Sequence, residues 1–177
     1  MKSKRAVLVD RDDTLCPDVP YCSDPADMHA FPDVPASVKR LNDAGYLVLM
    51  VTNQSGIGRG YFTLEQLNAV NAELLSQISA GGGRIDDIFF CPHRPEDNCD
   101  CRKPKTKMGL QAIEKYGLDP AECWMVGDHD KDIEFGRQLG MRTVKVSAET
   151  SFSDAVDIIL SEGAKSQNNP NNREETY

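Results

Sequence analysis

The feature that most constrains the fold is a short apolar run near the N-terminus that ends in two aspartates. Residues 6–9 are apolar and partly β-branched, which is typical of a strand buried on both faces of a parallel sheet. Asp10 and Asp12 follow, and Thr14 can begin a turn. In open parallel sheets the ligand crevice lies beyond the carboxyl ends of the strands. The run therefore predicts two carboxylates at the floor of a crevice, although such aspartates also serve as ordinary turn or cap residues.

Later segments repeat this pattern of a buried strand followed by a polar end. The relevant residues are Thr52 and Asn53 after the run 47–51, Lys103 within the basic segment 102–105, and Asp128 after the run 123–126. Further strands are expected at 85–91 and 142–146. Helical periodicity predicts helices at 34–44, 106–116, 130–139 and 151–160, and a helix after Thr63 and Gln66, which form a capping box before apolar positions from Leu64 to Ile78 that we assign to the core. Alternating strands and helices specify a parallel sheet covered by helices.

Length and charge limit the organisation and the partners. A chain of 177 residues is a natural length for one domain, which we place at residues 1–162. Residues 163–177 are polar without an apolar face and are predicted to form a disordered tail. The net charge of −8 argues against a nucleic-acid or membrane partner, because both require a cationic face. We expect a small soluble partner, and a monomer is favoured.

The N-terminus and the cysteines indicate a cytoplasmic protein. The basic residues 2–5 precede an apolar segment of about five residues, which is too short for a signal peptide or a membrane span. Six cysteines in a chain of this size need no disulfide framework, and three of them lie beside a histidine. Reduced thiols that hold a metal are the better interpretation. Cys16, Cys22 and Cys123 are expected to be core or loop thiols.

Four residues on one predicted loop have the spacing of a zinc site. Cys91, His93, Cys99 and Cys101 form the pattern C-x-H-x5-C-x-C. Four such ligands fit closed tetrahedral zinc and leave no open position for water. The sequence therefore predicts a structural Zn²⁺ that folds the loop preceding Arg102 and Lys103.

The ordered set of Asp10 with Asp12, Thr52, Lys103 and Asp128 resembles the haloacid dehalogenase (HAD) superfamily of phosphohydrolases. Segments 52–63 and 91–104 are similar to the branch that contains heptose-bisphosphate and histidinol-phosphate phosphatases. The resemblance covers residues 5 to 147. It implies an α/β fold, the Rossmann-like three-layer HAD fold with a parallel sheet, and no cap domain, because the loop 16–31 is too short for one.

The resemblance also implies roles for individual residues. Asp10 would be the nucleophile that forms an aspartyl-phosphate, and Asp12 the acid and base. A catalytic Mg²⁺ would be held by Asp10, Asp128 and the backbone carbonyl of Asp12. Thr52 and Lys103 would contact the phosphoryl group; Lys103 is preferred to Lys105 because it directly follows Cys-Asp-Cys-Arg. Asn53 and Arg102 would bind the substrate.

Three residues near these motifs need separate comment. Asp13 stands where the family usually has Gly; Asp tolerates a positive φ, but its charge adds to that of Asp10 and Asp12. His129 replaces the usual Lys or Arg and is interpreted as a helix-start residue. Asp132 lies one turn into the following helix and is expected to support or orient rather than to be the main metal ligand.

The expected function is a magnesium-dependent phosphohydrolase that cleaves a phosphate monoester of a small metabolite through an aspartyl-phosphate. Segment 52–63 favours a sugar bisphosphate such as D-glycero-D-manno-heptose 1,7-bisphosphate. The short spacing between His93 and Cys99 is more typical of histidinol-phosphate phosphatases, so that substrate stays an alternative. An alternative of another class is a catalytically silent HAD-like binding module, which Asp13 would favour.

Overall fold

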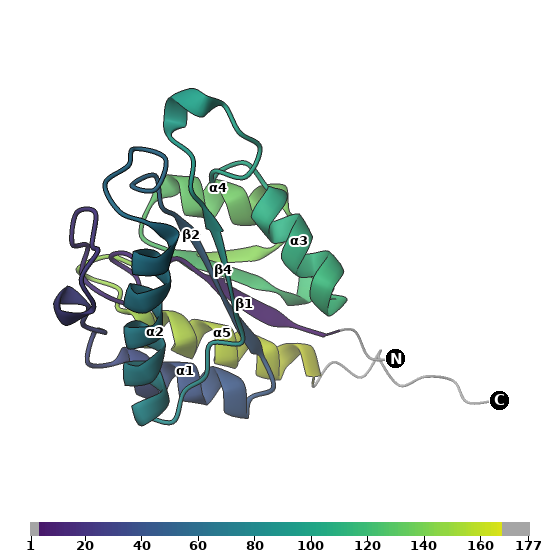
Figure 1. Ribbon diagram of the computed structural model, residues 1–177. Coiled ribbons are helices and arrows are strands. Elements are labelled where there is room, and N and C mark those ends of the chain that lie inside the picture. The colour runs from purple at the N-terminus through teal and green to yellow at the C-terminus, as the bar shows by residue number, and fades with distance from the viewer. Residues whose placement is uncertain (1–3, 168–177) are drawn as a thin grey trace.

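The computed structural model describes residues 4–167 and contains a central sheet between two layers of helices (Figure 1). The strands are β1 (Ala6–Val9), β2 (Leu47–Asn53), β3 (Asp87–Cys91), β4 (Trp124–Gly127) and β5 (Arg142–Lys145). The α-helices are α1 (Val34–Asp43), α2 (Leu64–Ala80), α3 (Lys107–Tyr116), α4 (Asp130–Gln138) and α5 (Phe152–Gln167). Short 3₁₀ helices occur at Pro25–Asp27, Pro95–Asp97 and Pro120–Glu122.

The sheet is parallel with the strand order β3-β2-β1-β4-β5, as the alternating pattern predicted. β1 is the central strand. The chain adds β2 and β3 on one side of it and then crosses to add β4 and β5 on the other. The carboxyl end of β1 therefore lies between those of β2 and β4. This is the switch point at which open α/β sheets bind ligands.

The two faces of the sheet are covered by different helices (Figure 1). Val7 and Val9 of β1 pack into a core formed with α1, α2 and α5. Ala6 and Leu8 point to the opposite face, into a core formed with α3 and α4. The alternation of side chains along a strand explains why β1 is fully buried on both faces.

Helix α2 begins as the sequence predicts but exposes one residue assigned to its core. The side chain of Thr63 accepts from the Gln66 backbone, and the side chain of Gln66 accepts in return from the Thr63 backbone. Leu67, Leu74 and other aliphatic residues are buried. Leu64 is 48% exposed, and the next two residues of the first turn, Glu65 and Gln66, are exposed as well. The expectation that Leu64 lies in the core was wrong.

Helix α5 continues to Gln167. The sequence pattern predicts a shorter helix that ends at residue 160 and a disordered tail from residue 163, and both bounds were wrong. Gly163 does not stop the helix. A Cβ at this position would lie 2.8 Å from Oη of Tyr46, so the glycine allows α5 to pack closely against that side chain. The rest of the predicted tail, residues 168–177, lies outside the described residues.

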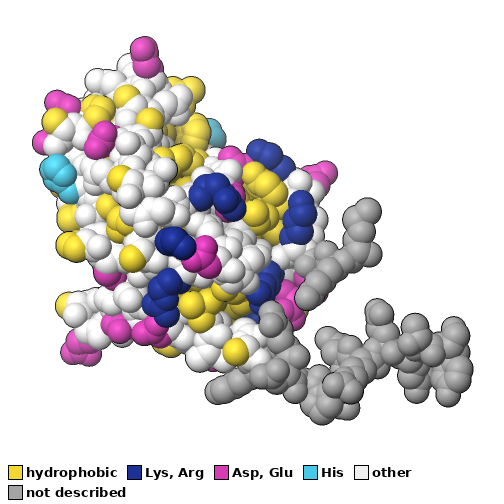
Figure 2. Space-filling model, turned by 90° about the horizontal axis from the view of Figure 1, so that it is seen from below, with side chains coloured by type: hydrophobic (Ala, Val, Ile, Leu, Met, Phe, Trp, Pro, Cys, Tyr) yellow, Lys and Arg dark blue, Asp and Glu magenta, His cyan; other side chains and the backbone are white. Residues whose placement is uncertain are grey.

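Charged side chains of both signs are interspersed on the face that is seen from below (Figure 2). Arg40 of α1 forms an ion pair with Asp157 of α5 at 2.6 Å. The face shown in Figure 2 therefore has no broad cationic area. Within residues 4–167, no helix is both long enough and apolar enough to cross a membrane.

Candidate active site and metal centres

Asp10 extends from the carboxyl end of β1 and is almost fully buried. Its backbone N–H donates to the carbonyl of Val126 at 3.0 Å, which ties the end of β1 to β4. The residue is 7% exposed. The sheet thus fixes the backbone from which the Asp10 carboxylate extends.

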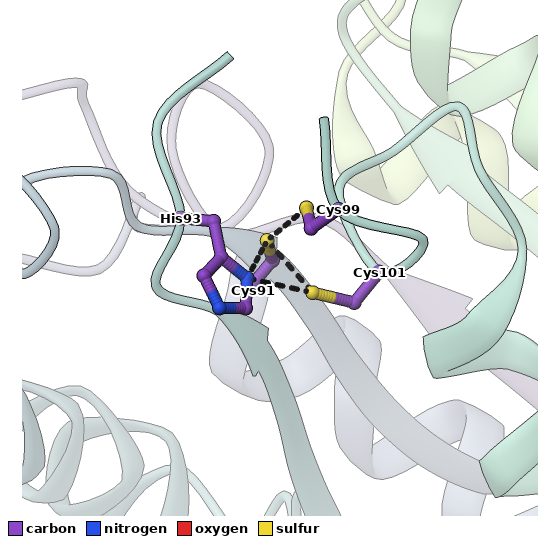
Figure 3. A group of neighbouring side chains, drawn as sticks. All are labelled: Cys91, His93, Cys99 and Cys101. Carbon is purple, nitrogen blue, oxygen red and sulfur yellow. Dashed lines mark hydrogen bonds between the residues drawn. The ribbon is translucent and has the colours of Figure 1, made fainter. Parts of the chain in front are cut away.

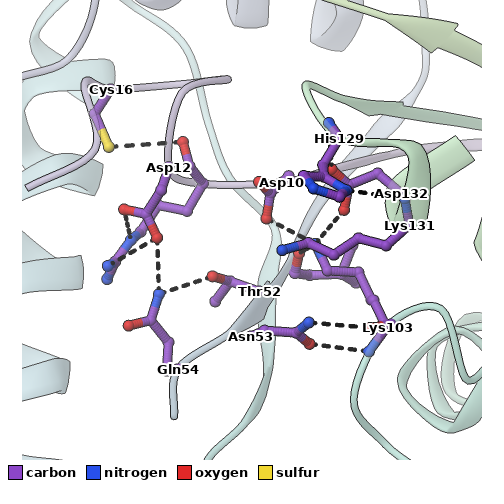
Figure 4. Close-up of polar contacts among 12 residues, drawn as sticks. Asp10, Asp12, Cys16, Thr52, Asn53, Gln54, Lys103, His129, Lys131 and Asp132 are labelled. Carbon is purple, nitrogen blue, oxygen red and sulfur yellow. Dashed lines mark hydrogen bonds and ion pairs between the residues drawn. The ribbon is translucent and has the colours of Figure 1, made fainter. Parts of the chain in front are cut away.

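Lys103 lies beside Asp10 and is itself buried (Figure 4). Its Nζ is 2.7 Å from Oδ1 of Asp10 and 2.8 Å from Oδ1 of Asp132, and it donates to the carbonyl of Val51 at 2.8 Å. Burial alone would lower the pKa of Lys103, but the two carboxylates outweigh it and raise that pKa. The ammonium group therefore stays charged inside the protein.

The choice of Lys103 over its neighbours agrees with this geometry. Lys105 is exposed and donates to the carbonyl of Cys99, and Lys107 pairs with Asp100 at the surface. Both polar groups of the Asn53 side chain bond the backbone of Lys103, at 2.9 and 3.2 Å. Asn53 therefore holds Lys103, although the sequence analysis expected it to bind substrate directly.

Three carboxylates form a cluster around this lysine. Ligand atoms of Asp10, Asp128 and Asp132 all lie within 4.8 Å of one another. Burial, followed by the charges of Asp10 and Asp132, raises the pKa of Asp128 to about 6. One ammonium thus faces three carboxylates, and the excess of negative charge on hard oxygen ligands fits a divalent cation such as Mg²⁺.

Asp132 and His129 belong to the start of α4. Asp132 is fully buried, and its Oδ2 accepts from the backbone N–H of His129 at 3.1 Å. His129 caps the helix, because its Nδ1 accepts from the backbone of Lys131 at 3.3 Å. The interpretation of His129 as a helix-start residue is confirmed. Asp132 contacts Lys103 directly, which is more than the loose support expected from its position one turn into the helix.

Asp12 points away from the carboxylate cluster into a separate set of contacts (Figure 4). The guanidinium of Arg11 donates to both of its carboxylate oxygens, at 3.0 and 3.2 Å. Gln54 donates to Oδ2 of Asp12 at 3.0 Å and to Oγ1 of Thr52 at 2.9 Å. Arg11 is 2% exposed and donates in turn to Oδ1 of Asn71 at 3.0 Å. Sequence reasoning did not assign Arg11, Gln54 or Asn71 to the site.

Asp13 occupies the left-handed turn that its position in the motif demanded. Its φ is +57°, a conformation in which Gly, Asn and Asp are favoured. Its Oδ1 accepts from the backbone N–H of Asp18 at 2.9 Å, so the carboxylate caps the loop that follows β1. Asp13, Asp128 and Lys145 also line a cavity of about 500 Å³ between this loop and the start of α5.

Arg102 precedes the buried lysine and is partly exposed. Its Nη1 is buried and has no hydrogen-bond partner among residues 4–167. Within the described part of the chain, the structure thus leaves one buried guanidinium nitrogen of Arg102 without a partner.

The four predicted zinc ligands meet in space, although they come from both ends of the loop after β3 (Figure 3). The Sγ of Cys91 lies 3.6 Å from that of Cys99 and 3.0 Å from that of Cys101, and Nδ1 of His93 lies 3.2 Å from Sγ of Cys101. Burial raises the pKa of Cys91. Burial also opposes ionisation of Cys99, but backbone N–H groups of Arg102 and Cys101 outweigh it and lower its pKa to about 6. Such a convergent S₃N donor set fits tetrahedral Zn²⁺.

The other three cysteines are free thiols in buried positions, as expected. Burial, reinforced by the nearby charge of Asp12, raises the pKa of Cys16 to about 12. Burial likewise raises the pKa of Cys123 to about 11. These thiols are inert parts of the core.

Comparisons with known proteins identify the family. Residues 100–158 match the HAD-hydrolase-like family. A probable D-glycero-D-manno-heptose-1,7-bisphosphate 7-phosphatase of Thermoplasma volcanium is 40% identical over 136 residues, which are 76% of this chain and 93% of that protein. A D-glycero-beta-D-manno-heptose-1,7-bisphosphate 7-phosphatase of Haemophilus ducreyi is 39% identical over 169 residues, 92% of this chain and 90% of the relative.

A solved structure agrees with these relatives. The D,D-heptose 1,7-bisphosphate phosphatase of B. bronchiseptica, complexed with magnesium and phosphate, superimposes with a TM-score of 0.81 at 29% identity. The match covers 90% of this chain and 99% of that one. The resemblance drawn from the sequence motifs is thereby confirmed, and the chain belongs to the heptose-bisphosphate phosphatase family of the HAD superfamily, a family of phosphoric monoester hydrolases.

Proposed function

We propose that this protein hydrolyses D-glycero-D-manno-heptose 1,7-bisphosphate to the monophosphate and inorganic phosphate, with Mg²⁺ as cofactor. The single observation that carries the proposal is the buried contact of Lys103 with Asp10, 2.7 Å apart, in a chain whose relatives are named for this reaction. The contact places a fixed positive charge beside the carboxylate that would attack phosphorus.

In the first half of the reaction Asp10 acts as a nucleophile. A carboxylate oxygen of Asp10 forms a bond to phosphorus while the bond from phosphorus to the sugar oxygen breaks. The sugar oxygen leaves as an alcohol after it takes a proton from Asp12. The product of this half is an aspartyl-phosphate on Asp10.

In the second half Asp12 acts as a base. It removes a proton from a water molecule, whose oxygen attacks phosphorus and displaces the Asp10 carboxylate. Inorganic phosphate is released, Asp10 is regenerated, and Asp12 again has its proton. The same residue thus donates and accepts one proton in each cycle.

The repulsion between an anionic substrate and an anionic nucleophile must be reduced by positive charge and by hydrogen bonds. Lys103 supplies a point charge, and the hydroxyl of Thr52 donates to a phosphoryl oxygen. Asp10, Asp128 and the backbone carbonyl of Asp12 would hold Mg²⁺, which neutralises phosphoryl charge when it is bound. Asn53 positions Lys103 through its backbone, and Arg102 holds the substrate.

We infer a structural role for Zn²⁺ at Cys91, His93, Cys99 and Cys101. All four donors come from the protein, so a bound zinc has no open position for chemistry. Its role is to fold the segment that ends at Arg102 and Lys103. We also propose that residues 1–162 fold as one domain, that the protein is a cytoplasmic monomer, and that its thiols stay reduced, since the six cysteines are unbridged.

Two alternatives are weaker. Histidinol phosphate is suggested by the short spacing between His93 and Cys99, whereas the relatives at 39% and 40% identity are named for heptose bisphosphate. A silent binding module has no need for a buried lysine held against two carboxylates, because burying such charges costs free energy.

The experiment that tests the proposal is phosphate release with Mg²⁺ from heptose 1,7-bisphosphate, compared with histidinol phosphate under the same conditions. We expect kcat/KM to be higher for the heptose substrate by at least about 100-fold, roughly 2.7 kcal/mol. A preference for histidinol phosphate would select the alternative. Equal inactivity towards both would reject this assignment.

A further inference from the structure

We propose that Gln54 is a positioning residue that orients Thr52 and Asp12 at the same time through the two hydrogens of its side-chain amide. The inference rests on the proposed function, since it concerns the hydroxyl that would contact the phosphoryl group and the carboxylate that would move the proton. It adds one residue whose loss disturbs both of these groups.

The contacts place Gln54 between the two groups (Figure 4). Its Nε2 donates to Oδ2 of Asp12 at 3.0 Å and to Oγ1 of Thr52 at 2.9 Å. The residue is 6% exposed, and its backbone N–H donates to the carbonyl of Cys91 at 2.7 Å. Gln54 is therefore fixed both at its backbone, next to the end of β2, and at its side chain.

The chemistry of the partners determines which way the amide is turned. Arg11 donates to both oxygens of Asp12, so these oxygens act as acceptors here and the NH₂ end of Gln54 must face them. That end carries two hydrogens, and the second one points to Thr52. Both donors of the amide are used by residues of the proposed reaction.

The direction of the second hydrogen bond matters for Thr52. Because Oγ1 accepts from Gln54, the hydroxyl hydrogen of Thr52 is directed elsewhere and remains free to donate to a phosphoryl oxygen. Thr52 is 1% exposed, so water does not compete for this arrangement. Without Gln54 the hydroxyl would rotate freely and donate in a productive direction less often.

Asp12 is held from its other side by Arg11, which is anchored by Asn71. Arg11 thus holds the carboxylate from one side, whereas Gln54 links it to Thr52 on the other. Removal of Gln54 leaves the ion pair with Arg11 intact. The effect of a substitution at this position should fall on the orientation of Asp12 rather than on its presence in the site.

The test compares Gln54→Met, which keeps the length of the side chain but has no donor, with the wild type on two substrates. One is the heptose bisphosphate, whose alcohol needs a proton as it leaves. The other is p-nitrophenyl phosphate, whose phenolate leaves without one. We expect kcat on the sugar substrate to fall about 10- to 100-fold, within the range of general acid–base contributions, and KM to change by less than about threefold.

The diagnostic quantity is the ratio of the two kcat/KM values, because kcat/KM reports the steps up to formation of the aspartyl-phosphate, in which Asp12 acts only as an acid. In these steps loss of Thr52 orientation slows both substrates, whereas loss of Asp12 orientation slows only the sugar substrate, so we expect the ratio to fall at least about threefold. The ratio does not depend on how much of a variant is folded. Gln138→Met is the matched control, because Gln138 is exposed on α4 and its Nε2 also donates to a carboxylate, that of Glu134, at 2.9 Å.

Double variants separate the two contacts. If Gln54 acts through its partners, Gln54→Met should lower the activity by a smaller factor when Asp12→Asn or Thr52→Val is already present than it does in the wild type. An unchanged kcat/KM ratio, or full additivity with both partner variants, would overturn the inference. Failure of the proposed function is a different result, in which the wild type itself releases no phosphate from the heptose bisphosphate.

Discussion

The two metal-ligand clusters of this molecule are built in opposite ways. The carboxylate cluster lies at the ends of β1 and β4, where Asp132 is fully buried and Asp10 is 7% exposed. It includes a cation of the protein itself, Lys103. The thiol cluster lies at the end of β3, which provides Cys91, and on the loop that follows, and its ligand atoms contact one another at 3.0 to 3.6 Å.

The difference shows what each cluster requires from a metal. The carboxylate side chains are positioned by strands and helices that the core stabilises, so the cluster keeps its shape when Mg²⁺ dissociates. Only Cys91 of the thiol cluster is fully buried, and residues 93–98 of its loop are mostly exposed, so we expect the structure of this loop to depend on bonds to Zn²⁺. Metal removal should therefore abolish activity in the first case and local structure in the second.

The largest effect is expected from Asp10→Asn. An amide neither attacks phosphorus nor carries charge to the metal, so turnover should fall by more than about 1,000-fold while the fold is retained. Phosphate release and thermal unfolding measured together check this prediction. Asp157→Asn, the same change at an exposed position, is the control, and activity of Asp10→Asn within about tenfold of wild type would reject the nucleophile assignment.

Lys103→Met tests whether the carboxylate cluster depends on its internal cation. The change leaves Asp10 and Asp132 buried without their partner, and such broken buried pairs typically cost about 3–5 kcal/mol in the free energy of unfolding. Denaturant titration measures the loss, with Lys105→Met as a surface control. Added Mg²⁺ should restore part of the stability of Lys103→Met, because it supplies the missing positive charge; a stability that is independent of Mg²⁺ would contradict this account.

Cys99→Ser tests the thiol cluster. We expect one Zn²⁺ per chain in the wild type and loss of that ion in the variant, with faster amide exchange confined to the loop between β3 and α3. Elemental analysis and hydrogen exchange provide the measurements, and Cys123→Ser should keep its zinc. Wild-type protein that contains no zinc when purified without chelator would rule out the site, and global unfolding of Cys99→Ser would contradict its local role.

Asp128→Asn tests the excess negative charge of the carboxylate cluster in Mg²⁺-free protein. The pKa of Asp128 is raised from its ordinary 3.8 to about 6, so the folded state binds this proton more tightly than the unfolded state. The proton on Asp128 therefore stabilises the folded state. This stabilisation is fully present below about pH 4 and is lost as the pH rises through about 6. Above that pH the variant should be more stable than wild type by about 1–2 kcal/mol, a value reduced because Asp128 is partly solvated.

The measurement for Asp128 is the difference in unfolding free energy between variant and wild type across pH 4 to 8. This difference should increase with pH and should shrink when Mg²⁺ is added to the wild type. A flat difference for Asp128→Asn would show that the carboxylate cluster carries no excess charge.

The features that could be predicted from the sequence are those with a local signal. Apolar runs followed by Asp10 and Asp128 predict strand ends, and the capping box at Thr63 predicts the start of α2, as observed. The convergence of Cys91, His93, Cys99 and Cys101 was predictable because their chemistry and spacing lie in one short segment. The parallel sheet follows from alternation alone. In each case the residues that decide the outcome are neighbours in the chain.

The features that could not be predicted depend on segments that meet only in the fold. Arg11, Gln54 and Asn71 come from three separate parts of the chain. Arg11 and Gln54 donate to Asp12, and Asn71 accepts from Arg11. One signal was present: Asn71 lies four residues after Leu67 on the apolar stripe of α2, where a polar side chain needs a buried partner. The error at Gly163 was of another kind. The sequence alone does not distinguish a glycine that permits close packing against Tyr46 from a glycine that ends a helix.

The smallest effect is expected at Asp13, the position that adds charge near the carboxylate cluster without belonging to it. Its side chain caps the Asp18 backbone at 2.9 Å and its φ is +57°, which glycine adopts equally well. Asp13→Gly should therefore change kcat/KM by less than about 1.4 kcal/mol, a factor of ten.

The competing expectation for Asp13 arises from the cavity that it shares with Asp128. If its charge acted through that cavity, Asp13→Gly would tighten substrate binding and weaken Mg²⁺ affinity together. Steady-state kinetics over a Mg²⁺ titration separates the two outcomes, and Asp13→Asn is the control that removes the charge but tolerates a positive φ. A flat response in both variants would place Asp13 in the turn alone. Opposite shifts of the two affinities in both variants would instead make Asp13 a fourth member of the carboxylate cluster, with its backbone conformation irrelevant to the effect.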